Sequence, residues 1–183
     1  TSIGIRTSAP YSVTWTLPGD GVRALRAVAT DGVGHSTSET IEVTLDQTAP
    51  TGTLDDPGAY VRGDVALRAT ASDATSGVNS VDFNYTGPVS GAFASAVGTT
   101  YDGTWHTAAL PDGSYDVNVF VTDRATNTFT SAAPRTVLVD NTAPTASVDG
   151  PGAFGHGTIA LAATSGDAGS GIDASKTVFE QSA

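Results

Sequence analysis

Asp-Gln-Thr-Ala-Pro-Thr at residues 46–51 returns as Asp-Asn-Thr-Ala-Pro-Thr at residues 140–145, 94 positions later. The similarity continues without a gap for more than thirty residues after each copy. Three further pairs of segments match: 53–60 with 147–154, 65–70 with 159–164, and 73–78 with 167–172. A repeat of this length has the size of a small domain, so we expect the chain to be built from like units of about 94 residues.

Composition narrows the classes of protein to which the chain can belong. It has 19 acidic and 8 basic residues and a net charge of −11, and so acidic a surface repels nucleic acid. Cysteine is absent, which excludes disulfides and thiol chemistry. No apolar run reaches 18 residues, so no membrane insertion is expected from this segment. Residue 1 is Thr and no signal peptide is evident, so we expect a mature or excised piece of a longer protein.

Short alternating segments predict a complete all-β unit over residues 47–140. Pro134 interrupts the last of these segments, which suits an edge strand or a bulge. About seven short strands separated by Gly, Pro and Asp turns are typical of an antiparallel sandwich, and no segment has helical periodicity. The expected strands cover residues 51–55, 64–72, 78–85, 104–109, 114–123 and 129–139, with a weak edge strand within 86–102.

The two flanks correspond to complementary halves of such a unit. Residues 1–46 match its second half, and residues 141–183 match its first half. Two explanations remain open: the chain is trimmed from a longer array, or half units of neighbouring chains complete each other by strand exchange. The strands expected in the flanks are 11–15, 23–30 and 38–45 in the first, and counterparts of the first two strands plus 176–179 in the second.

The strand from Tyr115 to Asn127 and the linker after it resemble tandem bacterial immunoglobulin-like repeats of secreted and cell-surface proteins. The strand reads Tyr-x-Val-x-Val-x-Val-Thr-Asp-x-Ala-x-Asn, and the linker at 139–145 reads Val-Asp-Asn-Thr-Ala-Pro-Thr. The resemblance implies tandem antiparallel sandwiches without significant helix. It also implies an extracellular or cell-surface location in bacteria and a non-catalytic role as a stalk, fibre or adhesin shaft. Tyr115 occupies the position of a tyrosine corner.

Other functions remain open beside the spacer. One is a virion or filament subunit assembled by strand exchange, whose partners would be units of adjacent chains as well as of the same chain. Another is an adhesive module with a glycan or protein ligand, which would need exposed aromatic side chains, for example within 86–102. Trp15 and Trp105 are equivalent and favour core packing over a carbohydrate platform. No nucleophile or acid pair stands out from the loop residues, so we do not expect an enzyme.

Calcium between units is the main chemical hypothesis. In an end-to-end array the linker, the loop after the second strand and the loop after the sixth strand meet at one pole of a sandwich. Hard cations bind clusters of carboxylate oxygens, although Asp also caps turns through its own backbone, and both roles remain open. The candidate ligands are Asp46, Asp73 and Asp123 at the first junction, and Asp140 and Asp167 at the second.

The opposite pole of the complete unit offers a second group of acids. Asp55 and Asp56 follow its first strand, and Asp112 lies in a turn expected near the same pole. A cation there is a weaker alternative to carboxylates that are simply solvated in turns. No cofactor other than calcium is expected.

Overall fold

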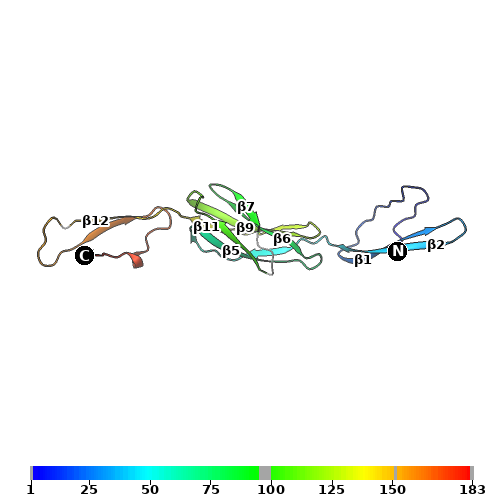
Figure 1. Ribbon diagram of the computed structural model, residues 1–183, viewed down its shortest axis with the longest axis horizontal. Helices are drawn as coiled ribbons and strands as arrows, with labels where there is room; N and C mark the ends of the chain where they lie inside the picture. The colour runs from blue at the N-terminus through cyan, green and yellow to red at the C-terminus, as the bar shows by residue number, and fades with distance from the viewer. Residues whose placement is uncertain (1, 95–99, 151, 182–183) are drawn as a thin grey trace.

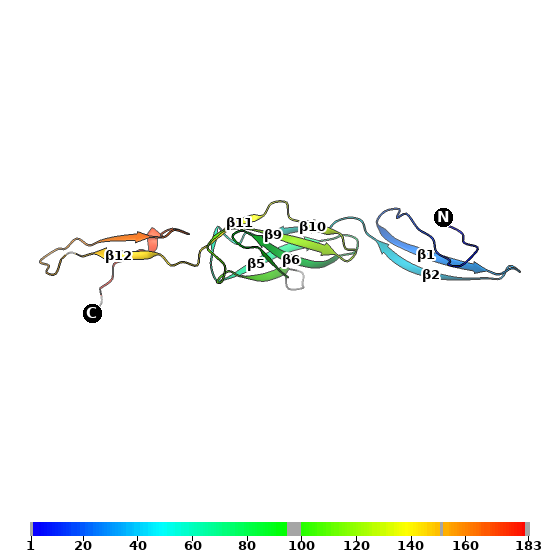
Figure 2. The ribbon, with the colours of Figure 1, turned by 90° about the horizontal axis from the view of Figure 1, so that it is seen from above.

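The computed structural model describes residues 2–94, 100–150 and 152–181, and nearly all of its regular structure is β-strand. Three parts follow one another along the long axis, with a hairpin at each end and a sandwich between them (Figure 1). A view turned by 90° shows the same order (Figure 2). The fold is therefore all-β, as the alternating segments predicted.

The middle part is a two-layer sandwich. One layer has the strand order β3-β5-β8, and the other has the order β4-β11-β9-β6-β7 with β10 attached to β9. Every pairing is antiparallel except that of β4 with β11. The strands are β3 (Thr51–Leu54), β4 (Tyr60–Val61), β5 (Asp64–Ser72), β6 (Val78–Thr86), β7 (Gly91–Ala94), β8 (Tyr101–His106), β9 (Gly113–Asp123), β10 (Thr128–Thr130) and β11 (Arg135–Val139).

The alternate side chains of β9 that point inward form the centre of the core. Every second side chain of a strand points to the same face, and on β9 that face is fully buried from Tyr115 to Val121. Leu67 of β5 and Phe83 of β6 are buried in the same cluster. Trp105 is only 2% exposed, which confirms its expected core role. The core thus joins both layers of the sandwich.

A tyrosine corner and aromatic contacts fix the sandwich at one side. The Tyr115 hydroxyl donates a hydrogen bond to the Pro111 carbonyl at 3.0 Å, so the predicted corner is confirmed. The ring of Tyr115 meets Trp105 edge-on, with 5.6 Å between centroids. In the segment proposed for glycan contact, Phe93 stacks on Phe83 at 5.4 Å rather than facing solvent. Residues 95–99 of that segment lie outside the described residues.

Each flank contains one two-stranded hairpin. β1 (Gly21–Thr30) pairs with β2 (Ser36–Leu45), and β12 (Thr145–Asp149) pairs with β13 (Ala162–Gly166), both antiparallel. These four strands agree with the strands expected at 23–30 and 38–45 and with the repeat of the first two strands. The division of the chain after residues 46 and 140 stays a prediction.

Two strands expected in the flanks are wrong. Residues 11–15 form no strand, and Ala174–Lys176 form a 3-10 helix that replaces the start of the strand expected at 176–179. Their counterparts in the sandwich, β8 and β6, are held by β5 and β9. A flank lacks the matching neighbour, so the backbone of these mostly exposed segments is left to water and no sheet pairing holds it extended. The strand expected at 129–139 is divided into β10 and β11, and Pro134 lies in the break.

Candidate metal centre

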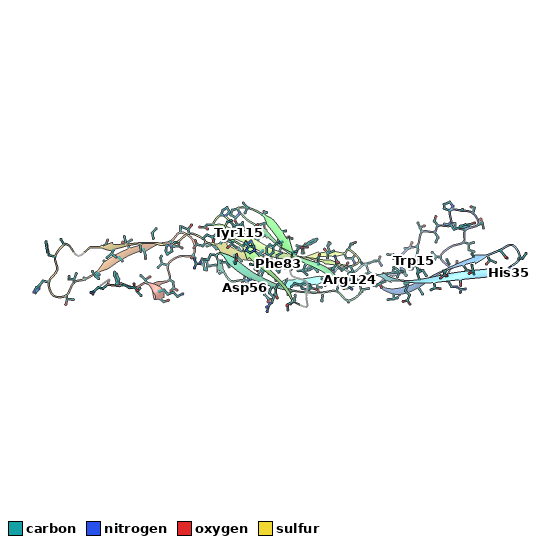
Figure 3. All side chains as sticks on the ribbon, viewed as in Figure 1. Trp15, His35, Asp56, Phe83, Tyr115 and Arg124 are labelled. Atoms are coloured by element: carbon teal, nitrogen blue, oxygen red, sulfur yellow. The ribbon has the colours of Figure 1, made fainter. Side chains whose placement is uncertain are left out.

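Three carboxylates converge where the first hairpin joins the sandwich. Asp46 follows β2, Asp73 follows β5, and Asp123 is the last residue of β9. One ligand oxygen from each lies within 4.8 Å of the other two. Asp123 is fully buried, and Asp46 is 9% exposed. Arg124, the neighbour of Asp123 in sequence, marks this end of the sandwich in Figure 3.

Asp73 organises the loop between β5 and β6. Its Oδ1 accepts the backbone amides of Thr75, Ser76 and Gly77 at 3.1, 2.9 and 2.7 Å. Gly77 has φ +80°, a left-handed conformation that glycine adopts without strain. The Oδ2 of Asp73 accepts no hydrogen bond among the described residues, so one oxygen of this carboxylate keeps its lone pairs free.

Asp123 performs a similar task in the turn after β9. Its Oδ1 accepts the Asn127 amide at 2.9 Å, and its Oδ2 accepts the Asn127 Nδ2 at 2.8 Å. The turn-capping role of Asp that the sequence left open is therefore present at both loops. Each carboxylate oxygen has two lone pairs, so these bonds leave capacity for a further partner.

Asp46 connects the linker to both loops. Its Oδ1 accepts the Thr48 amide at 3.1 Å, and its Oδ2 accepts the Ser76 amide at 3.1 Å. The Asn127 Nδ2 also donates to the Asp46 carbonyl at 3.2 Å. The pKa of Asp46 lies below its ordinary value because Ser76, and then the Thr48 amide, stabilise the charged form.

No cationic side chain neutralises this cluster among the described residues. The ion pairs found there involve Asp31, Asp64, Asp102 and Asp173. Arg124 forms no ion pair with Asp123, although it follows it in the chain. The cluster thus gathers three carboxylates of like charge, with spare oxygen lone pairs, which is the donor set that calcium prefers.

The opposite side of the same linker is held by Asp20. Its Oδ1 accepts the Gln47 amide at 2.8 Å, and its Oδ2 accepts the Thr48 hydroxyl. The sequence showed Asp20 only as part of a turn. The signal for its role was the recurrence of an Asp-Gly turn at Asp112, at a similar distance before the second linker.

The second linker repeats these contacts. Asp140 Oδ2 accepts the Ser170 amide at 2.6 Å, and Asp167 Oδ2 accepts the Gly171 amide at 2.6 Å. The side chain and the amide of Ser170 hold the pKa of Asp140 below its ordinary value. Asp112 accepts the Asn141 amide at 2.7 Å. Asp140 and Asp112 therefore repeat the contacts of their counterparts, whereas Asp167 accepts one loop amide where Asp73 accepts three.

The weaker cation site proposed at the other pole does not form. The one group of three metal-binding side chains in the described part of the chain is that of the first junction. Asp112 instead holds the second linker, where it also accepts the Thr142 hydroxyl at 2.5 Å. Asp56 caps its own turn by accepting the Gly58 amide at 2.9 Å.

Family models match most of the sandwich and the linker after it. Residues 50–119 match the model described as a bacterial Ig domain, and residues 99–161 match the bacterial Ig-like domain (group 3). No curated protein sequence matches the chain. Domains of this kind commonly occur in surface or extracellular proteins and are typically non-catalytic. Within the described residues, no helix has the length and apolar character needed to cross a membrane.

Proposed function

Residues 50–161 belong to the bacterial immunoglobulin-like domains, and on that premise we propose that the chain is a spacer of an extracellular bacterial protein. It would form part of a stalk, fibre or adhesin shaft built from tandem sandwiches. Each unit buries its own core, and short linkers that contain proline restrict the hinge between units. The role of such a chain is mechanical, because it holds another part of the protein at a distance from the surface.

The observation that carries this proposal is the acid cluster at the first linker. Asp46 precedes the sandwich, whereas Asp73 and Asp123 belong to its loops, and all three meet within 4.8 Å. A cation held there would tie the linker to the loops of the next unit. Without a cation the three charges repel one another and favour a looser hinge.

Calcium fits the donors better than other common metals. Carboxylate oxygens are hard ligands, and calcium takes six to eight oxygens in flexible geometry, including backbone carbonyls and water. The Oδ2 of Asp73 is free of hydrogen bonds among the described residues, and the other two carboxylates have unused lone pairs. We therefore assign calcium to Asp46, Asp73 and Asp123. Its function would be to stiffen the hinge rather than to catalyse a reaction.

Removal of one charge tests the assignment. Asp73→Asn retains an Oδ1 that can accept the three loop amides but lacks the negative charge. For the wild-type chain we expect calcium at a hundredfold its Kd to raise the Tm by roughly 10 °C. For D73N we expect most of that rise to vanish, while the Tm in chelator stays close to that of the wild type. Differential scanning calorimetry with calcium and with EDTA measures both.

The second junction supplies the matched control. Asp167 is the counterpart of Asp73 and accepts the amide of Gly171, the counterpart of Gly77, but it lies outside the cluster of three acids. In dilute solution, where the chain is a monomer, Asp167→Asn should leave the effect of calcium on the Tm intact. Small-angle scattering would report the hinge directly. If calcium and chelator give the same Tm and the same scattering curve for the wild-type chain, the calcium proposal fails.

A further inference from the structure

The β12–β13 hairpin exposes apolar side chains whose counterparts in the sandwich are buried. Residues 145–172 align with residues 51–78 at a constant offset, so each side chain has a defined counterpart. The exposed fraction rises from 5% to 64% between Leu54 and Val148, from 9% to 44% between Val65 and Ile159, and from 2% to 51% between Leu67 and Leu161. Val148 lies on β12, and Ile159 and Leu161 lie in the loop just before β13. These exposed apolar side chains are therefore ones that, at the counterpart positions of the sandwich, the second layer covers.

The β1–β2 hairpin is the counterpart of the strands that cover this face in the sandwich. The turn before β1 holds its linker through Asp20, as the turn before β9 does through Asp112. By this correspondence Leu25 stands where Val117 is fully buried. β9 pairs with β11 on one edge and with β6 on the other, whereas β1 pairs only with β2 among the described strands. Its second edge is open to a further strand.

The interface that would join the two hairpins already exists once, inside the sandwich. There β5 pairs with β8, β6 with β9, and β4 with β11, so strands of the first half meet strands of the second half along both sheets. The two hairpins of one chain lie at opposite ends of the molecule, with the sandwich between them (Figures 1 and 2). They cannot cover each other within one chain.

We propose that the inner face of the β1–β2 hairpin, which carries Leu25, docks the β12–β13 hairpin of a second copy of the chain. The pairing would reproduce the interface of the sandwich and bury Leu161 and Val148 as Leu67 and Leu54 are buried. The two faces that meet are different, so association is heterologous and runs head to tail.

A carboxylate on the first hairpin gives independent support. Asp31 follows β1, and its Oδ1 accepts the His35 amide at 2.8 Å. Asp123 makes the same bond with the amide of Asn127, at 2.9 Å. The side chains at these two positions also contact the Oδ2 of their Asp, at 3.0 and 2.8 Å. Asp31 is therefore the structural counterpart of the third acid in the cluster.

Docking would complete a second acid cluster. Asp140 and Asp167 repeat the roles of Asp46 and Asp73, and the described residues offer no third acid near them. Asp31 of the second copy would fill that position. This part of the inference rests on the proposed calcium function, whereas the docking itself does not. Calcium should then strengthen the association of copies as well as the hinge within one chain.

Sedimentation of the 183-residue chain in EDTA tests the docking alone. The wild-type mass should rise with concentration. Leu25→Asp and Leu161→Asp, which place a charge on either side of the interface, should each weaken association by roughly 30-fold or more. Val22→Asp is the matched control, since Val22 is 58% exposed on the other face of β1. It should associate as the wild type does.

A mixing experiment separates lost docking from a misfolded variant. L25D keeps an intact β12–β13 hairpin, and L161D keeps an intact β1–β2 hairpin. Their mixture should form a one-to-one pair that grows no further. A wild-type chain that stays monomeric, a mixture that does not pair, or a V22D variant weakened as much as L25D would overturn the docking. A monomeric wild type would mean that another segment covers the hairpin.

The role of Asp31 has its own readout. With calcium added, Asp31→Asn should lose the gain in association while it associates normally in EDTA. If copies associate but calcium does not strengthen their association, the docking is supported and the acid site shared between copies is contradicted. The Tm experiment on D73N reports the calcium proposal separately, because it follows the first junction within a single chain.

Discussion

The sandwich and the hairpins on either side of it have matching sequence, yet only the sandwich has a core. Among the described residues the core cluster lies between Leu54 and Val139. In the second flank the counterparts Val148, Ile159 and Leu161 are apolar and exposed, whereas in the first flank Leu25 is half-buried and Leu45 is buried. Alternation decides which side chains share a face, but burial needs a second sheet opposite that face. The comparison shows that alternation predicts which face of a strand needs to be covered, but not whether a second sheet covers it.

The two linkers offer a second comparison. Both are held on one side by an Asp of a turn, Asp20 or Asp112, and on the other by the amide of a loop serine. Only the first linker also has a cluster of three acids among the described residues. The two linkers therefore share the same backbone-to-carboxylate hydrogen bonds. They differ in the third acid, which only the first linker has nearby among the described residues.

The largest expected difference between sandwich and flank concerns the two tryptophans. Trp105→Ala removes a side chain that is 2% exposed, so we expect the sandwich to lose about 3–5 kcal/mol of unfolding free energy. Trp15→Ala should leave that free energy unchanged, because Trp15 is half-buried and outside the core cluster. Urea unfolding followed by far-UV circular dichroism measures both. Equal losses would show that flank and sandwich unfold as one unit.

A smaller effect should separate the two linkers. Asp112→Ala and Asp20→Ala each remove the acceptor of a linker amide. We expect each to lower the free energy of local opening at that amide by about 1 kcal/mol. Amide exchange should therefore quicken several-fold at Asn141 for D112A and at Gln47 for D20A. Added calcium should reduce the change at Gln47 and leave that at Asn141. A calcium effect of equal size at both amides would contradict the difference between the linkers.

The smallest expected effect is one that the two linkers share. The pKa values of Asp46 and Asp140 are lowered in the folded chain by Ser76 and Ser170. Their stabilising contribution is therefore complete above the ordinary Asp pKa of about 3.9 and is lost as the pH falls below it, through the folded values. Amide shifts of Ser76 and Ser170 in an NMR titration should change together below about pH 4. A midpoint above pH 4 would contradict the direction of these shifts.

Local patterns in the sequence were sufficient for several features of the structure. Tyr115 and Trp105 could be placed because the strand around Tyr115 alternates and the Leu-Pro turn precedes it. The prediction of strands at 11–15 and 176–179 was wrong. Alternation indicates which face of a strand is apolar, but it does not show whether a neighbouring strand is present to pair with it. Asp20 was missed as a linker residue because its partners at 47 and 48 are more than 25 positions away.

Three features could be predicted from the sequence alone: the repeat, the alternation typical of strands, and the placement of Asp at strand ends. Each can be read from the order of residues without knowing which strands pair. Which acids meet was decided by the tertiary structure. Asp46, Asp73 and Asp123 become neighbours only because β5 and β9 end at the pole where the linker enters. The turns that hold each linker likewise depend on strands that pair across the sandwich, and such distant pairings leave no local signal.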